Sequence, residues 1–389
     1  MKTINRKELL SIIQQDSNIN FIAYVITPWH AISLNAALLY YKSKGINLRG
    51  ITLIYPHIET GLHLAENDFK DPNIDVYISS DWGGVYNSYY DQNKSRLFNK
   101  WQKIKQSCRF YHHVLFGRWN IYNRPNFFVF APVFPMIGVG LDLQKMDKQI
   151  KYVALDEGVG TYLDNMEETL PRVRYIRDVR CLKNYWRDTI VTNHVLPAFH
   201  KMQNVYLFYK KNNMCYANQV MAPFYRQAVA AHITRCQPDV DLTNTIVVCT
   251  SVLYDNIFRD KEDIRVWRDV CEQLHRFGFK LAMKPHPRDT FFASFADSWN
   301  CQLLDVRLSM EDICEQTHPL AIIGHHSTAL ITASALWDIP AICVTDLFDR
   351  TKVDVDFMRI ADKYKETFGG IIQFPKDMDQ LIESINKLL

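Results

Sequence analysis

The chain has 389 residues, of which 48% are hydrophobic and 22% are charged, and its formal net charge is +3 at pH 7. This composition is typical of a soluble globular protein, and the length indicates two domains. The net charge is too small to argue for nucleic acid as a partner. The nine cysteines are odd in number and include no CxxC pair, which argues against a disulfide framework or a zinc site and favours reduced thiols.

The sequence predicts no membrane-spanning segment. Its N-terminus lacks the apolar stretch of a secretory signal, and the longest apolar run, 127–141, is shorter than the ~18 residues that a spanning helix needs. We therefore expect a cytoplasmic protein. The segment 94–124 interleaves Lys and Arg with aromatic residues, a mixture that suits peripheral association with an anionic inner-membrane surface or a sugar acceptor. A solvated helix face explains this mixture equally well.

The first half of the chain alternates short apolar runs with longer, helix-like stretches. Apolar runs without strict alternation of polar residues are typical of strands buried on both faces, as in parallel sheets. The pattern predicts an α/β domain. Its strands are expected at residues 21–27, 50–56, 74–80, 127–132 and 150–155.

The middle of the chain, 158 to about 237, is irregular and is expected to be mainly helical. It includes a basic stretch, 171–187, that either lines a groove or faces water. The polar residues 236–244 include a proline and precede a new apolar run, which indicates a domain boundary. We expect one α/β domain at 1–240 and a second at 241–389.

The second half repeats the alternation of strands and helices. Strands are expected at 245–255, 279–284, 301–306, 319–324 and 341–346. Asp260 is expected to cap the helix after the first of these strands, and Gly278 to end it. Further helices are expected from Ser309 and over 327–337. A closing helix at 376–389 is expected to pack back on the first domain.

Functional residues are expected in the turns that directly follow apolar runs. In open α/β sheets, ligands bind beyond the carboxyl ends of the strands, and two such domains form a cleft. Three turns carry side chains that suit chemistry.

The first turn contains Asp156, Glu157 and Gly158 at the end of an apolar run. Partial desolvation at a strand end raises the pKa of a carboxylate toward working pH, so the carboxylate can take a proton from a hydroxyl. Adjacent side chains of an extended segment point opposite ways, so one of the two acids is expected to face substrate. Gly158 permits a sharp turn. A solvated turn with an acidic helix cap would account for the same residues.

The second turn presents His286 between Pro285 and Pro287, two residues that hold the loop extended. Beside Lys284 and Arg288, an imidazolium can bind phosphate and release a proton to a leaving group. An ordinary turn histidine is the alternative interpretation.

The third turn follows a strand that ends at Gly324, and Ser327 or Thr328 then begins an apolar helix. Hydroxyls and free amides at a helix N-terminus form a phosphate site, although helix capping alone also explains the pair. His325 and His326 point opposite ways and lack the spacing of metal ligands, so metal binding is disfavoured.

Other motifs are incomplete or misplaced. The two Gly-x-Gly pairs lack the third glycine of a dinucleotide-binding fingerprint, and the chain has no P-loop or serine-hydrolase motif. A second His-Pro pair begins at His318 but precedes a strand, so we interpret this histidine as structural.

Together and in this order, the three turns resemble the D/E-D/E-G, HP and S/T motifs of bacterial sialyltransferases of the two-domain glycosyltransferase B (GT-B) type. The segment 24–41, with Thr27, Pro28 and His30, also resembles the first strand and helix of lipooligosaccharide sialyltransferases and capsular polysialyltransferases. The matches extend from residue 24 to about 330. The resemblance implies an α/β fold of two Rossmann-like domains, whose parallel sheets face a central cleft.

The resemblance also implies an activity, which is the inverting transfer of sialic acid from CMP-sialic acid to a hydroxyl of a glycan or glycolipid. The acceptor would belong to lipooligosaccharide, O-antigen or capsule, and neither a metal nor a cofactor would be required. The N-terminal domain would bind the acceptor and supply Asp156 as general base, and the C-terminal domain would bind CMP. His286 would serve as general acid and phosphate contact, assisted by Ser327 and Thr328. The remaining candidates for substrate binding are Glu157, Gly158, Lys284, Pro287 and His30.

The sequence is also compatible with three other functions. The chain could use another nucleotide sugar, such as a hexosamine or Kdo donor. It could instead be a non-catalytic sugar- or nucleotide-binding protein of capsule assembly. A nucleotide-sugar isomerase could also use this architecture.

Overall fold

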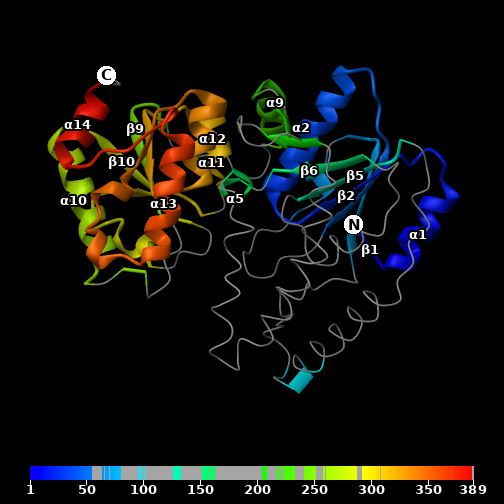
Figure 1. Cartoon of the computed structure of the whole chain (residues 1–389), viewed down its shortest axis with the longest axis horizontal. Helices are drawn as coiled ribbons and strands as arrows, with labels where there is room; N and C mark the ends of the chain where they lie inside the picture. The colour runs from blue at the N-terminus through cyan, green and yellow to red at the C-terminus, as the bar shows by residue number, and fades with distance from the viewer. Residues whose placement is uncertain are drawn as a thin grey trace. The chain divides into compact units, whose positions relative to one another are not determined.

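The computed structural model describes residues 1–54, 64, 66–69, 71–79, 95, 97–98, 101, 126–132, 151–156, 158–162, 204–207, 217–219, 222–232, 241–250, 257–258, 260–286, 291–306 and 308–387. They belong to two compact units (Figure 1). The first consists of Met1–Glu157 and Asp164–Phe224, and the second of Gly158–Leu163 and Tyr225–Leu389.

Within the described residues, the first unit contains a sheet of eight parallel strands in the order β1-β4-β3-β2-β5-β6-β7-β8. The strands are β1 (Lys2–Ile4), β2 (Phe21–Val25), β3 (Gly50–Ile54), β4 (Ile74–Ser79), β5 (Phe128–Pro132), β6 (Lys151–Leu155), β7 (Asn204–Leu207) and β8 (Ala217–Gln219). Every residue of β2 and β3 is buried. Central parallel strands are covered on both faces, which explains their continuous apolar sequence.

Helix α2 (Pro28–Ser43) follows β2 directly and lies against β2 and β6 (Figure 1). Thr27 caps its start and Pro28 occupies the first turn, where a proline costs no hydrogen bond. The ring of Tyr41 packs edge-on against Phe128 of β5, with 5.0 Å between the ring centroids. Helix α2 is therefore held to the sheet along its length, and its first turn lies at the carboxyl end of β2.

The other helices described around the first sheet are shorter. Asn5 and Glu8 form a reciprocal capping box at the start of α1. These elements are α1 (Arg6–Gln15) and the 3₁₀ helix η2 (Glu66–Asp68). Helix α9 (Ala222–His232) begins in the first unit and belongs to the second unit from Tyr225 onward.

The described part of the second unit contains a sheet of six parallel strands in the order β11-β10-β9-β12-β13-β14. The strands are β9 (Thr245–Cys249), β10 (Lys280–Lys284), β11 (Gln302–Leu303), β12 (Ala321–Gly324), β13 (Ala341–Cys343) and β14 (Ile372–Gln373). The helices are α5 (Val159–Tyr162), α10 (Glu262–Arg276), η5 (Phe292–Phe295), α11 (Met310–Thr317), α12 (Thr328–Trp337), η6 (Val344–Leu347), η7 (Arg350–Lys352), α13 (Val355–Phe368) and α14 (Met378–Asn386).

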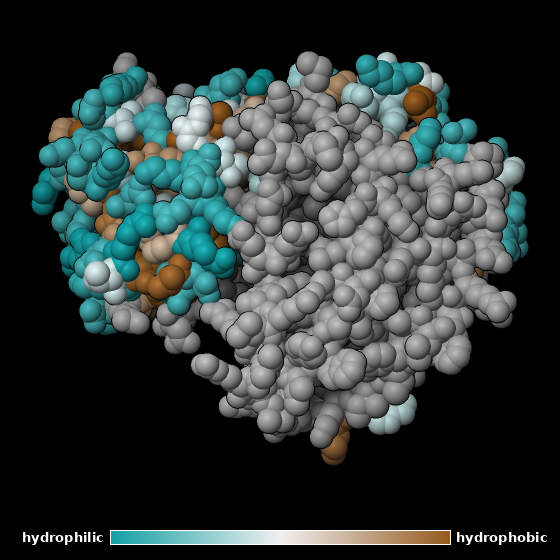
Figure 2. Space-filling view, in the orientation of Figure 1, coloured by the Kyte–Doolittle hydropathy of each residue, from teal (hydrophilic) through white to brown (hydrophobic). Residues whose placement is uncertain are grey.

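The core of the second unit lies between this sheet and its helices. Trp267 of α10 is fully buried there, with Val248 of β9 and Ile323 of β12 in the same cluster. The apolar residues of α10 recur at helical spacing and form its buried stripe. Figure 2 shows that the visible described surface of this unit is mainly hydrophilic, as expected where the apolar stripes face inward.

The strands expected from the long apolar runs are present in both units. The capping prediction for α10 is wrong, because Asp260 and Lys261 both adopt left-handed backbone angles and no side chain caps this helix. Gly278, with φ of +84°, does follow the end of α10 as expected. Ser309 begins α11 with a capping box to Asp312, also as expected.

Two expectations about domain organisation stay predictions. Residues 233–240, next to the expected boundary, lie outside the described residues. Helix α14 buries Leu381, Ile382 and Ile385 in the core of the second unit, and its expected packing against the first domain stays a prediction. Among the described helices, none is long and apolar enough to cross a membrane.

Candidate active site

The strand order of the second sheet identifies the place where a ligand is expected to bind. Strands β9, β10 and β11 follow one another toward one edge, and β12, β13 and β14 follow one another toward the other. The order therefore reverses between β9 and β12, and ligands of open α/β sheets bind beyond the carboxyl ends of the strands at such a point. The last residues of β10, β9 and β12, which are Lys284, Cys249 and Gly324, are paired in register. Because neighbouring strands are ~4.8 Å apart, β10 and β12 end about 10 Å from each other.

His286 lies two residues beyond the end of β10 and is half-buried. Its backbone N–H donates to Thr250 Oγ1 at 3.3 Å, and Thr250 directly follows β9. The main chain of the His-Pro loop is therefore attached to the neighbouring strand end. This bond is made by the backbone of His286 and not by its imidazole.

Lys284 has a different environment from the one expected for a phosphate contact. Its side chain is 5% exposed, and its ammonium donates to Pro285 O at 2.8 Å and to Val306 O at 3.3 Å. Burial lowers the pKa of Lys284, and the nearby Cys249 thiol and Glu311 carboxylate oppose that effect. In this structure Lys284 joins the His-Pro loop to the loop after β11, and its role in phosphate binding stays a prediction.

Ser327 and Thr328 lie at the N-terminus of α12, as the sequence predicted. Ser327 is the N-cap, and its hydroxyl accepts from the Ala329 N–H at 3.2 Å. Tyr364 of α13 donates its phenolic O–H to Ser327 O at 2.7 Å, which fixes the turn before the helix. Burial raises the pKa of Tyr364 well above its usual value, so this phenol stays protonated. The amides of the first turn of α12 have no partner within the helix, which gives this end of the helix a partial positive charge.

The two histidines before Ser327 are neutral at neutral pH. Burial lowers the pKa of His325 to about 3, assisted by repulsion from His326. Burial also lowers the pKa of His326 to about 4. The His325 ring packs against Trp267 with 5.1 Å between ring centroids, and the His326 ring packs against Phe357 at 4.7 Å. These contacts support the turn that presents Ser327.

Gly158 and Val159 contact the start of α12 within the second unit. The Val159 N–H donates to Thr328 Oγ1 at 3.0 Å. Gly158 has a φ of +84°, and a Cβ placed on it would lie 2.3 Å from Thr328 Oγ1. Glycine is therefore required here by both the backbone angle and the close approach. The glycine of the first motif thus packs against the threonine of the third.

Alanine at Gly158 is expected to destabilise the protein by about 2–5 kcal/mol, the sum of backbone strain and the contact with Thr328. The matched control is Gly278→Ala, because Gly278 has the same φ of +84° and a Cβ there meets nothing within 4 Å. That control should cost about 1–2 kcal/mol, from backbone strain alone. The free energy of unfolding, measured by urea titration, compares the two. Equal losses would contradict the close packing of Gly158 on Thr328.

Asp156 lies in the first unit, directly after β6, and is fully buried. Trp29, in the first turn of α2, donates its indole N–H to Asp156 Oδ1 at 3.0 Å. Ser33, one turn further along α2, donates its hydroxyl to the backbone O of Asp156 at 3.4 Å. Both the carboxylate and the main chain of Asp156 are therefore held by α2.

His30 caps the helix that carries Trp29. Its Nδ1 accepts from the Ile26 N–H at 3.3 Å and from the Thr27 N–H at 3.2 Å, while Thr27 Oγ1 accepts from the His30 N–H. His30 is 4% exposed. Because Nδ1 accepts these bonds, the neutral ring carries its proton on Nε2. This shows a structural role for His30, and its contact with substrate stays a prediction.

Two of the candidate residues, Glu157 and Pro287, lie outside the described residues, as does most of the segment 94–124. Trp29 was missed by the sequence reasoning, although it lies inside the Thr-Pro-x-His segment that was recognised. Nothing in its spacing indicated a bond to a residue 127 positions away. In the described part of the chain, no three His, Cys, Asp or Glu side chains are grouped to hold a metal ion.

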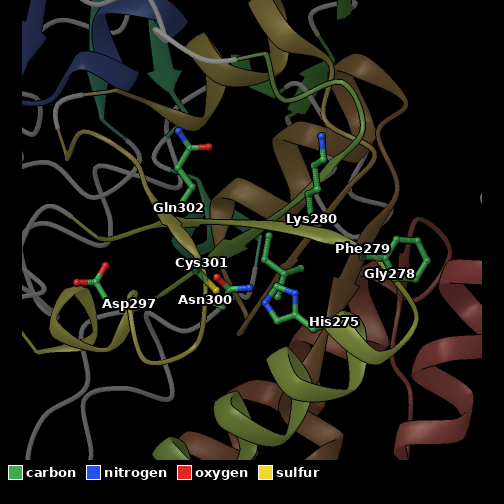
Figure 3. Close-up of a pocket in the computed structure, with 9 residues that line it drawn as sticks. His275, Gly278, Phe279, Lys280, Asp297, Asn300, Cys301 and Gln302 are labelled. Atoms are coloured by element: carbon green, nitrogen blue, oxygen red, sulfur yellow. The ribbon is translucent and has the colours of Figure 1, made fainter.

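A separate groove of about 610 Å³ opens in the second unit at the amino-terminal ends of β10 and β11 (Figure 3). Its lining includes Lys280 and Gln302, which begin these strands and point to one side of them, and His275 and Asn300, which lie on the opposite side of the strands (Figure 3). The groove therefore lies at the amino-terminal ends of the strands, whereas His286 and Ser327 follow the carboxyl ends of β10 and β12. Its lining includes none of the candidate site residues.

The chain matches one protein-family model over most of its length. The model of the alpha-2,8-polysialyltransferase (POLYST) family matches residues 21–345. That range contains all the candidate residues, from His30 to Thr328. No match to a curated protein sequence was found.

Several solved structures are similar to this chain at low sequence identity. A putative UDP-N-acetylglucosamine 2-epimerase from Listeria monocytogenes has a TM-score of 0.53 and 10% identity, over 95% of this chain and 87% of that one. A 2,6-sialyltransferase from Vibrionaceae Photobacterium sp. JT-ISH-224, in complex with CMP and lactose, has a TM-score of 0.45 and 10% identity, over 91% and 78%. An alpha/beta-galactoside alpha-2,3-sialyltransferase from Photobacterium phosphoreum has a TM-score of 0.47 and 12% identity, over 92% and 99%. At these identities the similarity concerns the fold alone.

Proposed function

Because the chain belongs to the alpha-2,8-polysialyltransferase family, it is a sialyltransferase, and we propose that its donor is CMP-sialic acid and its acceptor a hydroxyl of a glycan. The observation that carries the proposal is the set of groups beyond the ends of β10, β9 and β12. These are His286, Thr250 and the N-terminus of α12 with Ser327 and Thr328. They lie where the strand order reverses, which is where a nucleotide is expected.

The phosphate of CMP is proposed to bind at the start of α12. Free backbone amides and the partial positive charge of a helix N-terminus favour an anion, and Ser327 and Thr328 add hydroxyls. His286 approaches from the end of β10 and adds a charged hydrogen bond when its imidazole is protonated. One phosphate carries little charge for a metal to neutralise, so these groups are proposed to hold the donor on their own.

Asp156 is proposed to be the general base. As the acceptor oxygen attacks the anomeric carbon of sialic acid, the carboxylate of Asp156 takes the hydroxyl proton, and the bond from that carbon to the phosphate oxygen breaks. The electron pair of that bond leaves with CMP, whose phosphate gains negative charge. His286 and the amides of α12 are proposed to stabilise that charge, and His286 can return a proton to the phosphate.

The D/E-D/E-G motif is proposed to connect the general base, Asp156, covalently to the residues that pack on the phosphate site at the start of α12. Glu157 alone separates Asp156, which α2 holds, from Gly158, which packs against Thr328. A change at the start of α12 would therefore reach the base through two peptide links. Glu157 stays a candidate for substrate binding.

The acceptor is proposed to be a glycan of lipooligosaccharide, O-antigen or capsule, which the enzyme reaches at the cytoplasmic face of the inner membrane. Three apolar side chains support this in the segment 94–124: Leu97 is 80% exposed, Phe98 39% and Trp101 60%. The same segment has several Lys and Arg residues and no Asp or Glu. Apolar and cationic side chains together favour an anionic membrane surface. Equal sedimentation with anionic and with neutral lipid vesicles would contradict this part of the proposal.

A donor panel tests the proposed reaction. The purified enzyme is incubated with CMP-sialic acid, CMP-Kdo or UDP-N-acetylhexosamine, each with and without a sialylated oligosaccharide, and nucleotide release and sugar products are measured. CMP should be released from CMP-sialic acid in an acceptor-dependent reaction, and the other donors should remain intact. Consumption of another donor, or conversion of a nucleotide sugar without transfer, would contradict the proposed donor. Binding of CMP without any consumption would indicate a non-catalytic protein.

A further inference from the structure

The first two turns of α2 contact the end of β6 through two side chains on one helix face. Trp29 and Ser33 are four residues apart, so they lie one above the other on the helix. Trp29 Nε1–H donates to a carboxylate oxygen of Asp156 at 3.0 Å, and Ser33 Oγ–H donates to its backbone oxygen at 3.4 Å. Two donors from one rigid element therefore fix both the position and the rotation of this acid.

The start of α2 is itself held by an unusual cap. Thr27 and His30 bond reciprocally, with the imidazole in the position that Glu or Gln usually occupies in a capping box. Pro28 restricts the backbone between them. Trp29 lies inside this closed turn, so its backbone has little freedom and its indole is delivered to one place. His30 thereby supports Trp29.

The chemistry of the indole determines what the contact with Asp156 can do. An indole N–H donates and cannot accept, so it pairs with a carboxylate oxygen that offers a lone pair. A hydrogen bond of this kind favours the ionised carboxylate over the protonated acid. Through this bond the carboxylate of Asp156 also lies near the partially positive N-terminus of α2, which likewise favours its ionised form.

We propose that Trp29 is a positioning residue for the general base. It holds Oδ1 of Asp156, so that the carboxylate that takes the acceptor proton has one orientation. The inference rests on the proposed function, because it requires Asp156 to be the base. Trp29 itself is proposed to touch neither the donor nor the acceptor.

The test replaces the N–H while keeping the ring. Trp29→Phe removes the donor and part of the side chain, and replacement of Trp29 by benzothienylalanine, through suppression of an amber codon, exchanges N–H for sulfur at nearly constant shape. With CMP-sialic acid and a sialylated acceptor, kcat should fall about 10- to 100-fold in both variants, the effect of losing a hydrogen bond to a charged group. KM for CMP-sialic acid should change by less than about twofold, because Trp29 is proposed not to contact the donor. The acid limb of the kcat profile should move to higher pH, because the ionised carboxylate has lost a donor.

A second indole that donates to a carboxylate provides a matched control. Trp337 of α12 is 6% exposed, and its Nε1–H donates to Glu315 Oε2 at 2.7 Å. Trp337→Phe removes the same kind of bond from a structural position, so it should lower the melting temperature and leave the acid limb of the pH profile in place. A shift of the acid limb in this control as well would contradict a specific role for Trp29.

The outcomes separate this inference from the proposed function. If Asp156→Asn is inactive while the benzothienylalanine variant retains wild-type kcat and pH profile, the positioning role of Trp29 is wrong and the base assignment stands. If Asp156→Asn retains full activity, the base assignment fails, and the inference about Trp29 fails with it. A loss of kcat that accompanies an unchanged acid limb would mean that Trp29 acts only through packing, which would also overturn the inference.

Discussion

Asparagine in place of Asp156 is expected to lower the rate of sialyl transfer by about 10²- to 10⁴-fold, the range that a general base contributes. An amide cannot take the acceptor proton at neutral pH. Its oxygen can still accept the N–H of Trp29, and the bond from Ser33 to the backbone is unaffected. The fold and the affinity for CMP should therefore be retained. Initial rates with CMP-sialic acid and titration with CMP measure the two effects.

The control for this variant is Asp75→Asn, at an exposed position of β4 in the same sheet. It should transfer sialic acid at the wild-type rate. Wild-type activity of Asp156→Asn would exclude Asp156 as the base. Loss of CMP affinity along with the rate would instead indicate that the substitution had disturbed the fold.

Alanine at His286 is expected to weaken CMP binding about 10- to 100-fold and to lower turnover as well. The first effect is that of losing a hydrogen bond to a charged group, and the second follows because the same imidazole is proposed to stabilise the leaving phosphate. The bond that the structure shows for the loop runs from the His286 backbone to Thr250, and alanine preserves it. The loop should therefore keep its position while the imidazole is lost. Calorimetric titration with CMP and steady-state kinetics measure both quantities.

His318 provides the matched histidine for this experiment. It ends α11 in the left-handed conformation, with φ of 44°, which agrees with the structural role expected from the sequence. Asparagine tolerates that conformation, so His318→Asn should bind CMP and turn over as the wild type does. An unchanged dissociation constant for CMP in His286→Ala would exclude His286 from the phosphate site.

The fold class could be predicted from the sequence because buried parallel strands have a strong signature. The predicted class, α/β of the GT-B type with a parallel sheet in each half, is confirmed. The strands that were missed are weaker signals. Strand β1 has three residues and β14 has two, and such strands form by pairing with a neighbour. Strands β7 and β8 lie in the irregular middle segment, where short runs gave no period.

The sequence could predict the candidate site residues that directly follow a strand, but not the contacts between segments that are distant in the chain. Residues that follow strands, such as Asp156 and His286, are indicated by the end of an apolar run. Gly158 could be predicted as a turn residue, and its positive φ agrees, but its contact with Thr328 depends on packing between distant segments. Trp29 was missed for the same reason. Lys284 was expected to contact phosphate, but its ammonium donates to two backbone carbonyl oxygens. The sequence pattern of a strand does not indicate which carbonyl oxygens a long side chain will reach.

The enzyme is proposed to move sialic acid from CMP-sialic acid to a glycan hydroxyl. The most direct measurement incubates the purified enzyme with CMP-sialic acid on a glycan array and reads which glycans gain sialic acid. We expect sialic acid on a defined set of glycans, together with an equal amount of released CMP. Release of CMP with no sialylated glycan, or no consumption of the donor at all, would contradict it.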